Sequence, residues 1–344
     1  MQILPADGPE KSSFLPAHGG NLDWAAVIYG TPKAGWLDLS TGINPNAYPL
    51  PEISPQSWQR LPGKTATRKL LDTARRYYGF SEDASLCPLP GTQAAIQRLP
   101  HLIAPCEVAI LSPTYSEHGI CWARAGHRVR EISTLSELKN ARVVVLVHPN
   151  NPDGRLYAKL ELHALQEEMR RRGGLLVVDE AFADTAPDVS LAPLAGGDGL
   201  VILKSLGKFF GLAGLRLGFM AGPLILVEQM REEIGPWAVS GPALEIGTKA
   251  LTDSIWIDEM RKSLALSAKR VDRMLENTGL ELRGGTDLFR LVETPDAPRL
   301  FDHLCRAGLL VRAFEGRPRH LRFGLPGEEK DWRRLKVALH AFAK

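Results

Sequence analysis

The chain has 344 residues, of which 44% are hydrophobic and 24% are charged, and its formal net charge is +3. This composition is ordinary for a soluble globular protein, and the length predicts a sizeable core and two domains. The basic residues are spread along the sequence and form no stripe of the kind that binds nucleic acid. We therefore expect no nucleic-acid partner.

Membrane, secretory and metal-binding signals are also missing from the pattern. The most apolar window, residues 215–227, is interrupted by Arg216 and Pro223, so it predicts no membrane span. The first residues lack a basic region followed by an apolar stretch, which favours a cytoplasmic protein without a signal peptide. No cysteine belongs to a CxxC pair or to a His/Cys cluster with zinc-ligand spacing, so we expect reduced thiols and no metal site. The cysteines are Cys87, Cys106, Cys121 and Cys305.

Residues 1–40 are rich in glycine and proline, and they predict an extended arm that belongs to the smaller domain. In residues 41–238, apolar runs alternate with amphipathic stretches. Continuous apolar runs indicate strands covered on both faces, and their alternation with helices indicates an α/β domain with a mainly parallel sheet. The runs are 108–111, 143–147, 175–178, 201–203 and 219–221.

The pattern changes towards the carboxyl terminus. Helical segments are predicted at 242–253 and 257–277. Short strands are predicted after them, at 280–283, 288–292, 309–312 and 320–323. Residues 239–344 therefore form the predicted smaller α+β domain.

Lys208 lies in a glycine-rich segment directly after an apolar run, among small and apolar residues. A desolvated lysine amine is a nucleophile and commonly forms a Schiff base with a carbonyl, including that of pyridoxal phosphate (PLP). Arg216 follows past two further glycines, Gly211 and Gly214, and offers a fixed cation for a phosphate. The alternative is a glycine-rich turn that carries two surface cations.

Three other strand ends offer matching chemistry. Thr92 and Gln93 open a helical pattern after a glycine turn, where free N–H groups favour a phosphate. Asn151 follows a strand in a polar turn, and Asp179 ends a buried strand, where a carboxylate needs a cationic partner. Taken singly, these are equally a capped helix, a turn and a structural ion pair. Together they predict one site at the carboxyl ends of the strands.

In these motifs the chain resembles the fold-type-I PLP enzymes of the aspartate aminotransferase-like superfamily. Within them it is similar to the histidinol-phosphate aminotransferase and threonine-phosphate decarboxylase branch, and most of all to the CobC-type decarboxylases of cobalamin synthesis. The superfamily motifs are 150–154, 179–182 and 208–216. The loops that carry the closer resemblance are 18–21, 40–45, 58–62, 90–94, 113–115 and 321–326.

The resemblance implies a role for each cofactor-binding residue. Lys208 would attach PLP and move protons, Asp179 would pair with the pyridinium nitrogen, and Asn151 would bond to the phenolate oxygen. Tyr115 would stack on the ring, as a third catalytic residue beside Lys208 and Asp179. The cofactor phosphate would be held by Thr92, Gln93, Ser205 and Arg216.

The resemblance also implies substrate contacts and a homodimer. Arg322 would receive the substrate carboxylate through its planar guanidinium. The arm that contains His18 and Gly20 would reach the substrate end of the site, together with Asn151. An ordered loop histidine is the alternative for His18.

Three positions depart from common patterns of the superfamily. Phe182 stands where many relatives have a tyrosine, Gly207 replaces a hydroxyl residue beside the lysine, and Leu61 replaces a tyrosine of many aminotransferases. The first and third departures fit the decarboxylase branch better than the aminotransferase branch.

The resulting hypothesis is decarboxylation of L-threonine O-3-phosphate to (R)-1-amino-2-propanol O-2-phosphate. Transamination of the histidinol-phosphate type is the main alternative, since the geometry at Cα selects the reaction and the sequence does not fix that geometry. A third possibility is an effector-sensing domain of a transcription regulator. Such regulators carry a DNA-binding unit ahead of this domain, and the residues that precede the α/β region here are rich in proline and glycine instead.

Overall fold

The computed structural model describes residues 15–343, so the first fourteen residues of the predicted arm lie outside the described residues. Contacts divide the chain into two units. The larger unit is Asn46–Leu264, and the smaller unit joins the chain up to Pro45 to Ala265–Lys344. The sequence predicts the boundary after residue 238, whereas the contacts group residues as far as Leu264 with the larger unit.

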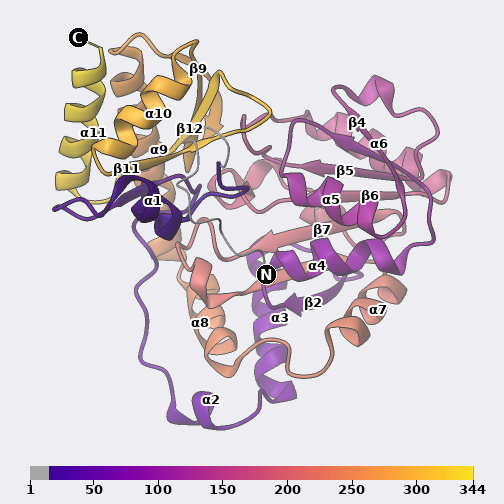
Figure 1. The fold of residues 1–344 in the computed structure, drawn as a ribbon. Helices are drawn as coiled ribbons and strands as arrows, with labels where there is room; N and C mark the ends of the chain where they lie inside the picture. Colours follow the sequence, from indigo (N-terminus) through magenta and orange to yellow (C-terminus); the bar gives the residue numbers. More distant parts are fainter. Residues whose placement is uncertain (1–14, 344) are drawn as a thin grey trace. The chain divides into compact units, whose positions relative to one another are not determined.

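The larger unit is built on a seven-stranded sheet of order β2-β8-β7-β6-β5-β3-β4 (Figure 1). β8 runs in the direction opposite to the other six strands, so the predicted α/β fold with a mainly parallel sheet is confirmed. The strands are β2 (Ser85–Leu89), β3 (Glu107–Leu111), β4 (Arg128–Ile132), β5 (Val143–Val147), β6 (Leu175–Asp179), β7 (Leu200–Ser205) and β8 (Gly218–Gly222).

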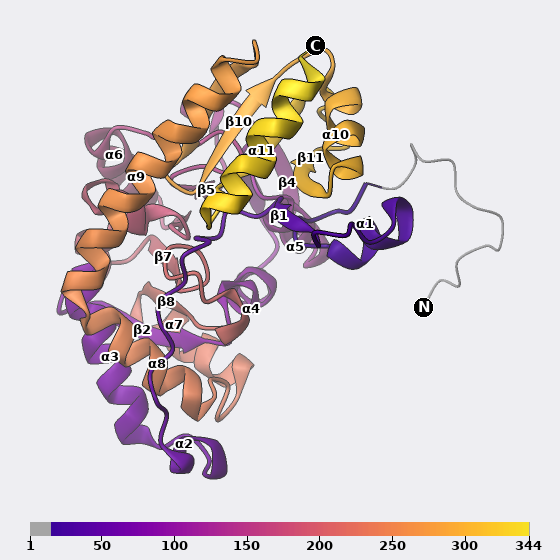
Figure 2. The same cartoon turned by 90° about the vertical axis from the view of Figure 1, so that its left-hand side faces the viewer.

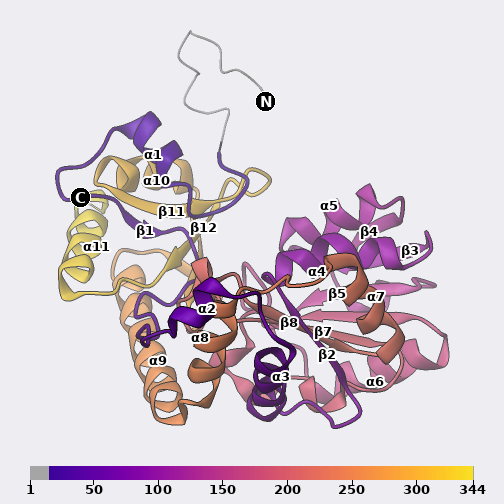
Figure 3. The same cartoon turned by 90° about the horizontal axis from the view of Figure 1, so that it is seen from below.

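Helices cover both faces of this sheet, which is why its central strands are apolar except at their carboxyl ends. Every residue of β5, β6 and β7 is buried. α4 (Thr92–Arg98) and α5 (Ser116–Arg124) lie on one face, and α3 (Lys64–Tyr78) and α6 (Lys159–Arg171) lie on the other (Figures 2 and 3). The remaining helices of this unit are α2 (Pro55–Gln59), α7 (Leu224–Ile234), α8 (Gly241–Thr252) and the first half of α9 (Ser254–Glu276).

Short 3-10 helices join several of these elements. They are η1 (Leu99–Leu102), η2 (Leu135–Glu137), η3 (Ala183–Thr185), η4 (Pro187–Val189), η5 (Ala192–Leu194) and η6 (Ala213–Leu215).

The smaller unit contains a five-stranded sheet of order β1-β11-β12-β10-β9. Its strands are β1 (Leu37–Leu39), β9 (Glu281–Thr286), β10 (Phe289–Glu293), β11 (Leu309–Ala313) and β12 (His320–Gly324). Its helices are α1 (Leu22–Tyr29), the end of α9, α10 (Ala297–Arg306) and α11 (Glu329–Phe342). The four predicted strands after residue 280 correspond to β9, β10, β11 and β12.

The prediction of an extended arm is wrong for the part that the structure describes. Asn21 caps α1 by accepting the Trp24 N–H at 2.9 Å, and the Trp24 ring lies 6.3 Å from the Phe301 ring of α10. β1 then pairs in parallel with β11. Packing of a short apolar segment thus outweighs the local preference of glycine and proline for irregular structure.

Within residues 15–343, no helix combines the length and apolar character that a membrane crossing requires. The four cysteines are free thiols, as the sequence predicts.

Candidate functional site

The sheet of the larger unit brings the four sequence motifs to one edge. β8 aligns Leu89 with Gly218 and Gly218 with Ser205, while β6 aligns Asp179 with Leu203 and with Val147. The parallel strands therefore end where the antiparallel β8 begins. Four loops start at this edge, those after β2, β5, β6 and β7. The segment before β8 lies there as well, as the sequence predicts.

Asp179 is fixed at the end of β6 by two hydrogen bonds. Its side chain is 4% exposed. The Ala181 N–H donates to Oδ1 at 3.0 Å, and Nε2 of His118 lies 3.0 Å from Oδ2. Because a carboxylate only accepts, the His118 ring donates this bond. The result is a buried anion with a fixed orientation.

Tyr115 lies at the start of α5, next to His118. Its hydroxyl donates to Oε1 of Gln93 at 3.2 Å, and its ring meets the His118 ring edge-on at 6.1 Å. Gln93 in turn donates to Glu117 at 3.1 Å. Burial, with Glu117 and Asp179 as lesser causes, raises the pKa of Tyr115 to about 12. The phenol is therefore neutral at physiological pH.

The start of α4 and the side chain of Arg216 face each other closely. Gly91, the residue before α4, has a positive φ of 82°, and no side chain caps the helix. A Cβ on Gly91 would lie 2.5 Å from Nη2 of Arg216. The guanidinium thus lies against the helix start, where the first N–H groups of Thr92 and Gln93 have no helical acceptor.

Ser205 ends β7 beside this helix start. Its side chain is buried, and its Oγ accepts the Gly207 N–H at 3.2 Å. A Cβ on Gly207 would lie 3.2 Å from Cα of Ala213 and 3.5 Å from Oγ of Ser205. The segment is packed so tightly that a hydroxyl residue at position 207 would require a small shift.

Lys208 follows in the same segment and is half-buried. Its Nζ lies 5.8 Å from the centre of the Phe182 ring, within cation–π range. Phe182 is buried and belongs to the loop after Asp179. The lysine amine is thus set beside an apolar ring in the loop that also carries the carboxylate.

Asn151 lies in the loop after β5, the strand next to β6. The neighbouring Asn150 fixes this loop: it accepts from Thr114 at 2.7 Å and donates to Pro113 at 2.8 Å and to Asp153 at 2.7 Å. The loop of Asn151 is thereby tied to the segment that leads into Tyr115.

Arg322 belongs to the smaller unit, on β12, and is 6% exposed. Its Nη2 donates to the Ser40 carbonyl at 2.8 Å, and its guanidinium lies 5.0 Å from the centre of the Phe289 ring. Arg312 of β11 is its direct cross-strand partner. Burial first, and then Arg312, lower the pKa of Arg322 to about 9, while Asp38 acts in the opposite direction.

The glycine-rich arm reaches the same part of the smaller unit. The Gly20 N–H donates to Oγ of Ser40 at 2.7 Å, and Oγ of Ser40 donates to Asp38 at 2.6 Å. Gly20 and Arg322 therefore both bind Ser40. His18 is exposed two residues before Gly20.

Sequence reasoning missed two of these residues. His118 lies one helical turn after Tyr115, a position that becomes informative only once α5 is packed beside Asp179. Arg312 is one of several arginines near the carboxyl terminus, and only the pairing of β11 with β12 sets it opposite Arg322.

The residues of the larger unit fit PLP chemically. The uncapped helix start and Arg216 suit a phosphate dianion, and Gly91 leaves space that any other residue would fill. The buried Asp179 suits a protonated pyridine nitrogen. A half-buried amine at Lys208 suits attachment to the aldehyde.

Comparisons with known proteins agree with this fit. The aminotransferase class I and II family matches residues 52–339. Threonine-phosphate decarboxylases from Pseudomonas aeruginosa and a Sinorhizobium species are 44% and 43% identical to the chain, each over 94% of it and 97% of the relative. A histidinol-phosphate aminotransferase structure from Sinorhizobium meliloti, in complex with pyridoxal-5'-phosphate, matches with a TM-score of 0.78 at 19% identity. This match covers 96% of the chain and 98% of that structure.

The family match spans most of the sequence, and two relatives above 40% identity cover nearly all of it. The structural likeness confirms the predicted fold. The chain therefore belongs to the aminotransferase class I and II family of PLP-dependent enzymes.

Proposed function

We propose that this enzyme decarboxylates L-threonine O-3-phosphate and releases (R)-1-amino-2-propanol O-2-phosphate and CO₂. The observation that carries the proposal is the 44% identity to the Pseudomonas aeruginosa threonine-phosphate decarboxylase over almost the whole of both chains. Phe182 and Leu61, which depart from the common aminotransferase pattern, support the same choice. A cytoplasmic role in cobalamin synthesis remains part of the proposal.

In the proposed site, the larger unit holds the cofactor. Lys208 attaches PLP, Asp179 holds the pyridine nitrogen in its protonated form, and Asn151 donates to the phenolate oxygen. Tyr115 covers the ring face, supported by the hydroxyl bond to Gln93. The phosphate is held by the N–H groups of Thr92 and Gln93, the hydroxyl of Ser205 and the guanidinium of Arg216.

The smaller unit supplies the proposed substrate contacts. Arg322 binds the substrate carboxylate, and the directly opposed Arg312 adds a second positive charge. Like charges that face each other across two strands are destabilising, so the pair is suited to an anion that compensates both charges. His18, Gly20 and Asn151 are the further substrate contacts that we propose.

PLP, when bound, would withdraw electrons from a bond at Cα of the substrate. The protein selects that bond through its grip on the carboxylate, which is the proposed task of Arg322. The bond from Cα to the carboxylate breaks, CO₂ leaves, and a proton is delivered to Cα. Nζ of Lys208 is the proposed source of that proton.

The proposal is tested by incubating the PLP-loaded enzyme with L-threonine O-3-phosphate and measuring CO₂ and the amine product. We expect release of CO₂ without any keto acid, and much slower release from unphosphorylated threonine. No release between roughly pH 6 and 9 would contradict the proposal. Keto-acid formation that requires 2-oxoglutarate would instead favour the histidinol-phosphate type of transamination.

We also propose that the enzyme is a homodimer. Among the exposed large apolar side chains of the larger unit are Leu50 at 69%, Trp58 at 69%, Leu61 at 67% and Trp237 at 58%. Three of them lie in or beside α2, whose Ser57 donates to Glu245 of α8 at 2.6 Å, and Trp237 lies just before α8. Exposed apolar side chains of this kind are candidates for burial against a second copy of the chain, with Trp58 and Leu61 as the pair to test.

A further inference from the structure

A second pair of charged residues lies at the same strand ends as Asp179 and Ser205. Glu180 follows Asp179 directly, and Lys204 precedes Ser205 directly. The Glu180 N–H donates to the Leu203 carbonyl at 2.9 Å, which continues the pairing of β6 with β7. Both side chains are buried: Glu180 is 0% exposed and Lys204 is 2% exposed.

The two charges form a closed set of hydrogen bonds with Ser190. Nζ of Lys204 lies 2.5 Å from Oε2 of Glu180 and donates to Oγ of Ser190 at 3.0 Å. Oγ of Ser190 donates to Oε2 of Glu180 at 2.5 Å, and the Leu191 N–H donates to Oε1 at 2.7 Å. The Tyr78 ring covers the ammonium, with its centre 4.8 Å from Nζ.

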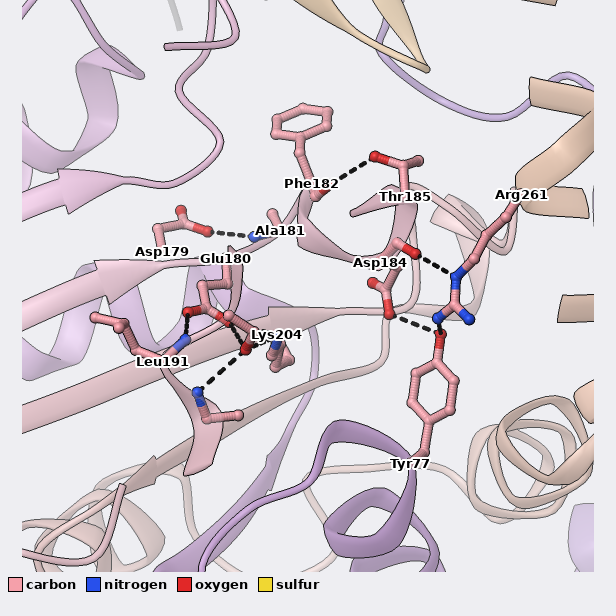
Figure 4. A network of polar contacts seen from close by, with 12 residues as sticks. Tyr77, Asp179, Glu180, Ala181, Phe182, Asp184, Thr185, Leu191, Lys204 and Arg261 are labelled. Atoms are coloured by element: carbon pink, nitrogen blue, oxygen red, sulfur yellow. Dashed lines mark hydrogen bonds and ion pairs between the residues drawn. The ribbon is translucent and has the colours of Figure 1, made fainter. Parts of the chain in front are cut away.

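This pair lies on the opposite face of the strand ends from the cofactor residues. Successive side chains of a strand point to opposite faces, so Glu180 alternates with Asp179, and Lys204 alternates with Ser205. Figure 4 shows Asp179 on one side of the strand end, with Glu180 and Lys204 on the other. The pair therefore acts on the site only through the backbone.

Stability alone does not explain such a pair. Taking two charges out of water costs several kcal/mol per ion, and a well-packed apolar pair is often at least as stabilising. What an ion pair adds is direction, because every bond in the set has a fixed length and angle. Here those bonds hold β6, β7 and the segment at Ser190 in one relative placement.

We propose that Glu180 and Lys204 are positioning residues that set the spacing between Asp179 and Ser205. With this spacing, Asp179 contacts the ring of PLP while Ser205 contacts the phosphate of the same molecule. This inference rests on the cofactor contacts proposed for Asp179 and Ser205. It predicts that loss of the pair uncouples the two contacts, while each contact by itself survives.

The test compares PLP with pyridoxal, which has the same ring and aldehyde but no phosphate. Dissociation constants of both are measured by titration of the apoenzyme, for the wild type and for E180Q/K204M. The double variant removes both charges together, so neither Glu180 nor Lys204 is left as a buried ion without its partner. We expect the preference for PLP over pyridoxal to fall by about tenfold, with affinity for pyridoxal nearly unchanged.

A matched control removes an ion pair of the smaller unit. Nε of Arg290 lies 2.5 Å from Oδ1 of Asp272, and both side chains are largely buried. D272N/R290M is expected to change the melting temperature and to keep the wild-type preference for PLP. If E180Q/K204M fails to fold, Ser190→Ala, which removes only the bridging hydroxyl, is expected to lower the preference by about threefold.

Two results would overturn the inference in distinguishable ways. A folded E180Q/K204M or Ser190→Ala variant with the wild-type preference would overturn it alone. Wild-type apoenzyme that binds no PLP would overturn the cofactor assignment, and the inference with it. Turnover of phosphothreonine enters neither measurement, so the proposed reaction is tested separately.

Discussion

At the residue scale, Asp179 depends on a neighbour from another element. His118 reaches it from α5 at 3.0 Å, and both side chains are almost fully buried. A buried carboxylate that is denied a partner is costly, and its orientation is no longer fixed. The histidine therefore supports the proposed cofactor site through its bond to the carboxylate.

We predict that His118→Phe lowers the affinity of the apoenzyme for PLP by one to two orders of magnitude. A hydrogen bond to a charged buried group contributes about 1.5–3 kcal/mol, which corresponds to that range. His118→Asn, whose side-chain N–H can still donate, is expected to lose less. Equal affinity of wild type and His118→Phe, measured by titration with PLP, would refute this role.

Residues of the proposed site could be predicted only where a local sequence pattern, such as a preceding apolar run, indicates their burial. Lys208 and Asp179 follow apolar runs, so their burial was readable from the sequence. His118 lies in the middle of an ordinary helical segment, and Lys204 ends a run that reads as plain strand. Their importance comes from partners that the fold brings in from elsewhere in the chain.

At the element scale, the turn between β2 and α4 depends on a glycine. Gly91 has a φ of 82°, and a Cβ there would lie 2.5 Å from the Arg216 guanidinium. Gly79, which ends α3 with a φ of 68°, has no atom within 4 Å of the same position. The two glycines thus share the backbone conformation but differ in their surroundings.

We predict that Gly91→Ala and Gly79→Ala each destabilise the fold by about 1–2 kcal/mol, because alanine is strained at a positive φ. Only Gly91→Ala is expected to weaken PLP binding, by about tenfold, because it pushes Arg216 away from the helix start. Thermal unfolding and PLP titration separate the two effects. Equal PLP affinity in both variants would count against the proposed phosphate site.

Another inter-element contact joins η3 to α3 and α9 (Figure 4). The Tyr77 hydroxyl donates to Oδ1 of Asp184 at 2.9 Å, and Nε of Arg261 donates to the Asp184 carbonyl at 2.9 Å. Burial raises the pKa of Asp184 from 3.8 to about 6, although Lys204 and Tyr77 act in the opposite direction.

This pKa makes stability depend on pH in a defined window. Between about pH 4 and 6 the unfolded chain releases the proton of Asp184 while the folded chain keeps it, so stability falls as the pH rises. The wild type should lose roughly 3 kcal/mol of unfolding free energy across this window relative to Asp184→Asn. Denaturant titrations at pH 4 and pH 7 measure the difference. If wild type and Asp184→Asn differed in unfolding free energy by the same amount at both pH values, the raised pKa of Asp184 would be contradicted.

Most strands could be predicted, and two of the exceptions, β2 and β4, have physical reasons. The predicted strand 143–147 has the same bounds as β5, because a run of valines and leucine is unambiguous. β4 was missed since it is a half-exposed edge strand with two arginines and a glutamate, and β2 was missed since it contains Pro88. Both elements owe their conformation to the neighbouring strand rather than to local preference.

At the scale of the whole molecule, topology explains why distant motifs meet. β8 runs against its neighbours, so Arg216 before it reaches the edge that Lys208 and Asp179 reach from strands of the opposite direction. The order of the motifs along the sequence could suggest one site. Only the antiparallel pairing of β8 explains why Arg216, which precedes its strand, lies with Lys208 and Asp179, which follow or end theirs. Helix α1, by contrast, depends on packing against α10 that no local pattern reveals.

We predict that the enzyme sediments as a dimer and that W58E/L61E shifts it to the monomer at micromolar concentration. Two charges at the exposed apolar group would have to lose their hydration in the interface. Leu160→Glu is the matched control, since Leu160 is 86% exposed on α6, away from α2. Monomeric wild type, or a variant that stays dimeric, would contradict the proposed interface.

The most direct test of the account is to reduce the PLP-loaded enzyme with borohydride and map the label by mass spectrometry. We predict pyridoxyl phosphate on Lys208 alone, and no label in Lys208→Ala. Lys204 lies in the same stretch of chain but is ion-paired with Glu180 at 2.5 Å, so fragmentation must distinguish the two lysines. Label on Lys204 or on any other lysine, or none, would contradict the proposed site.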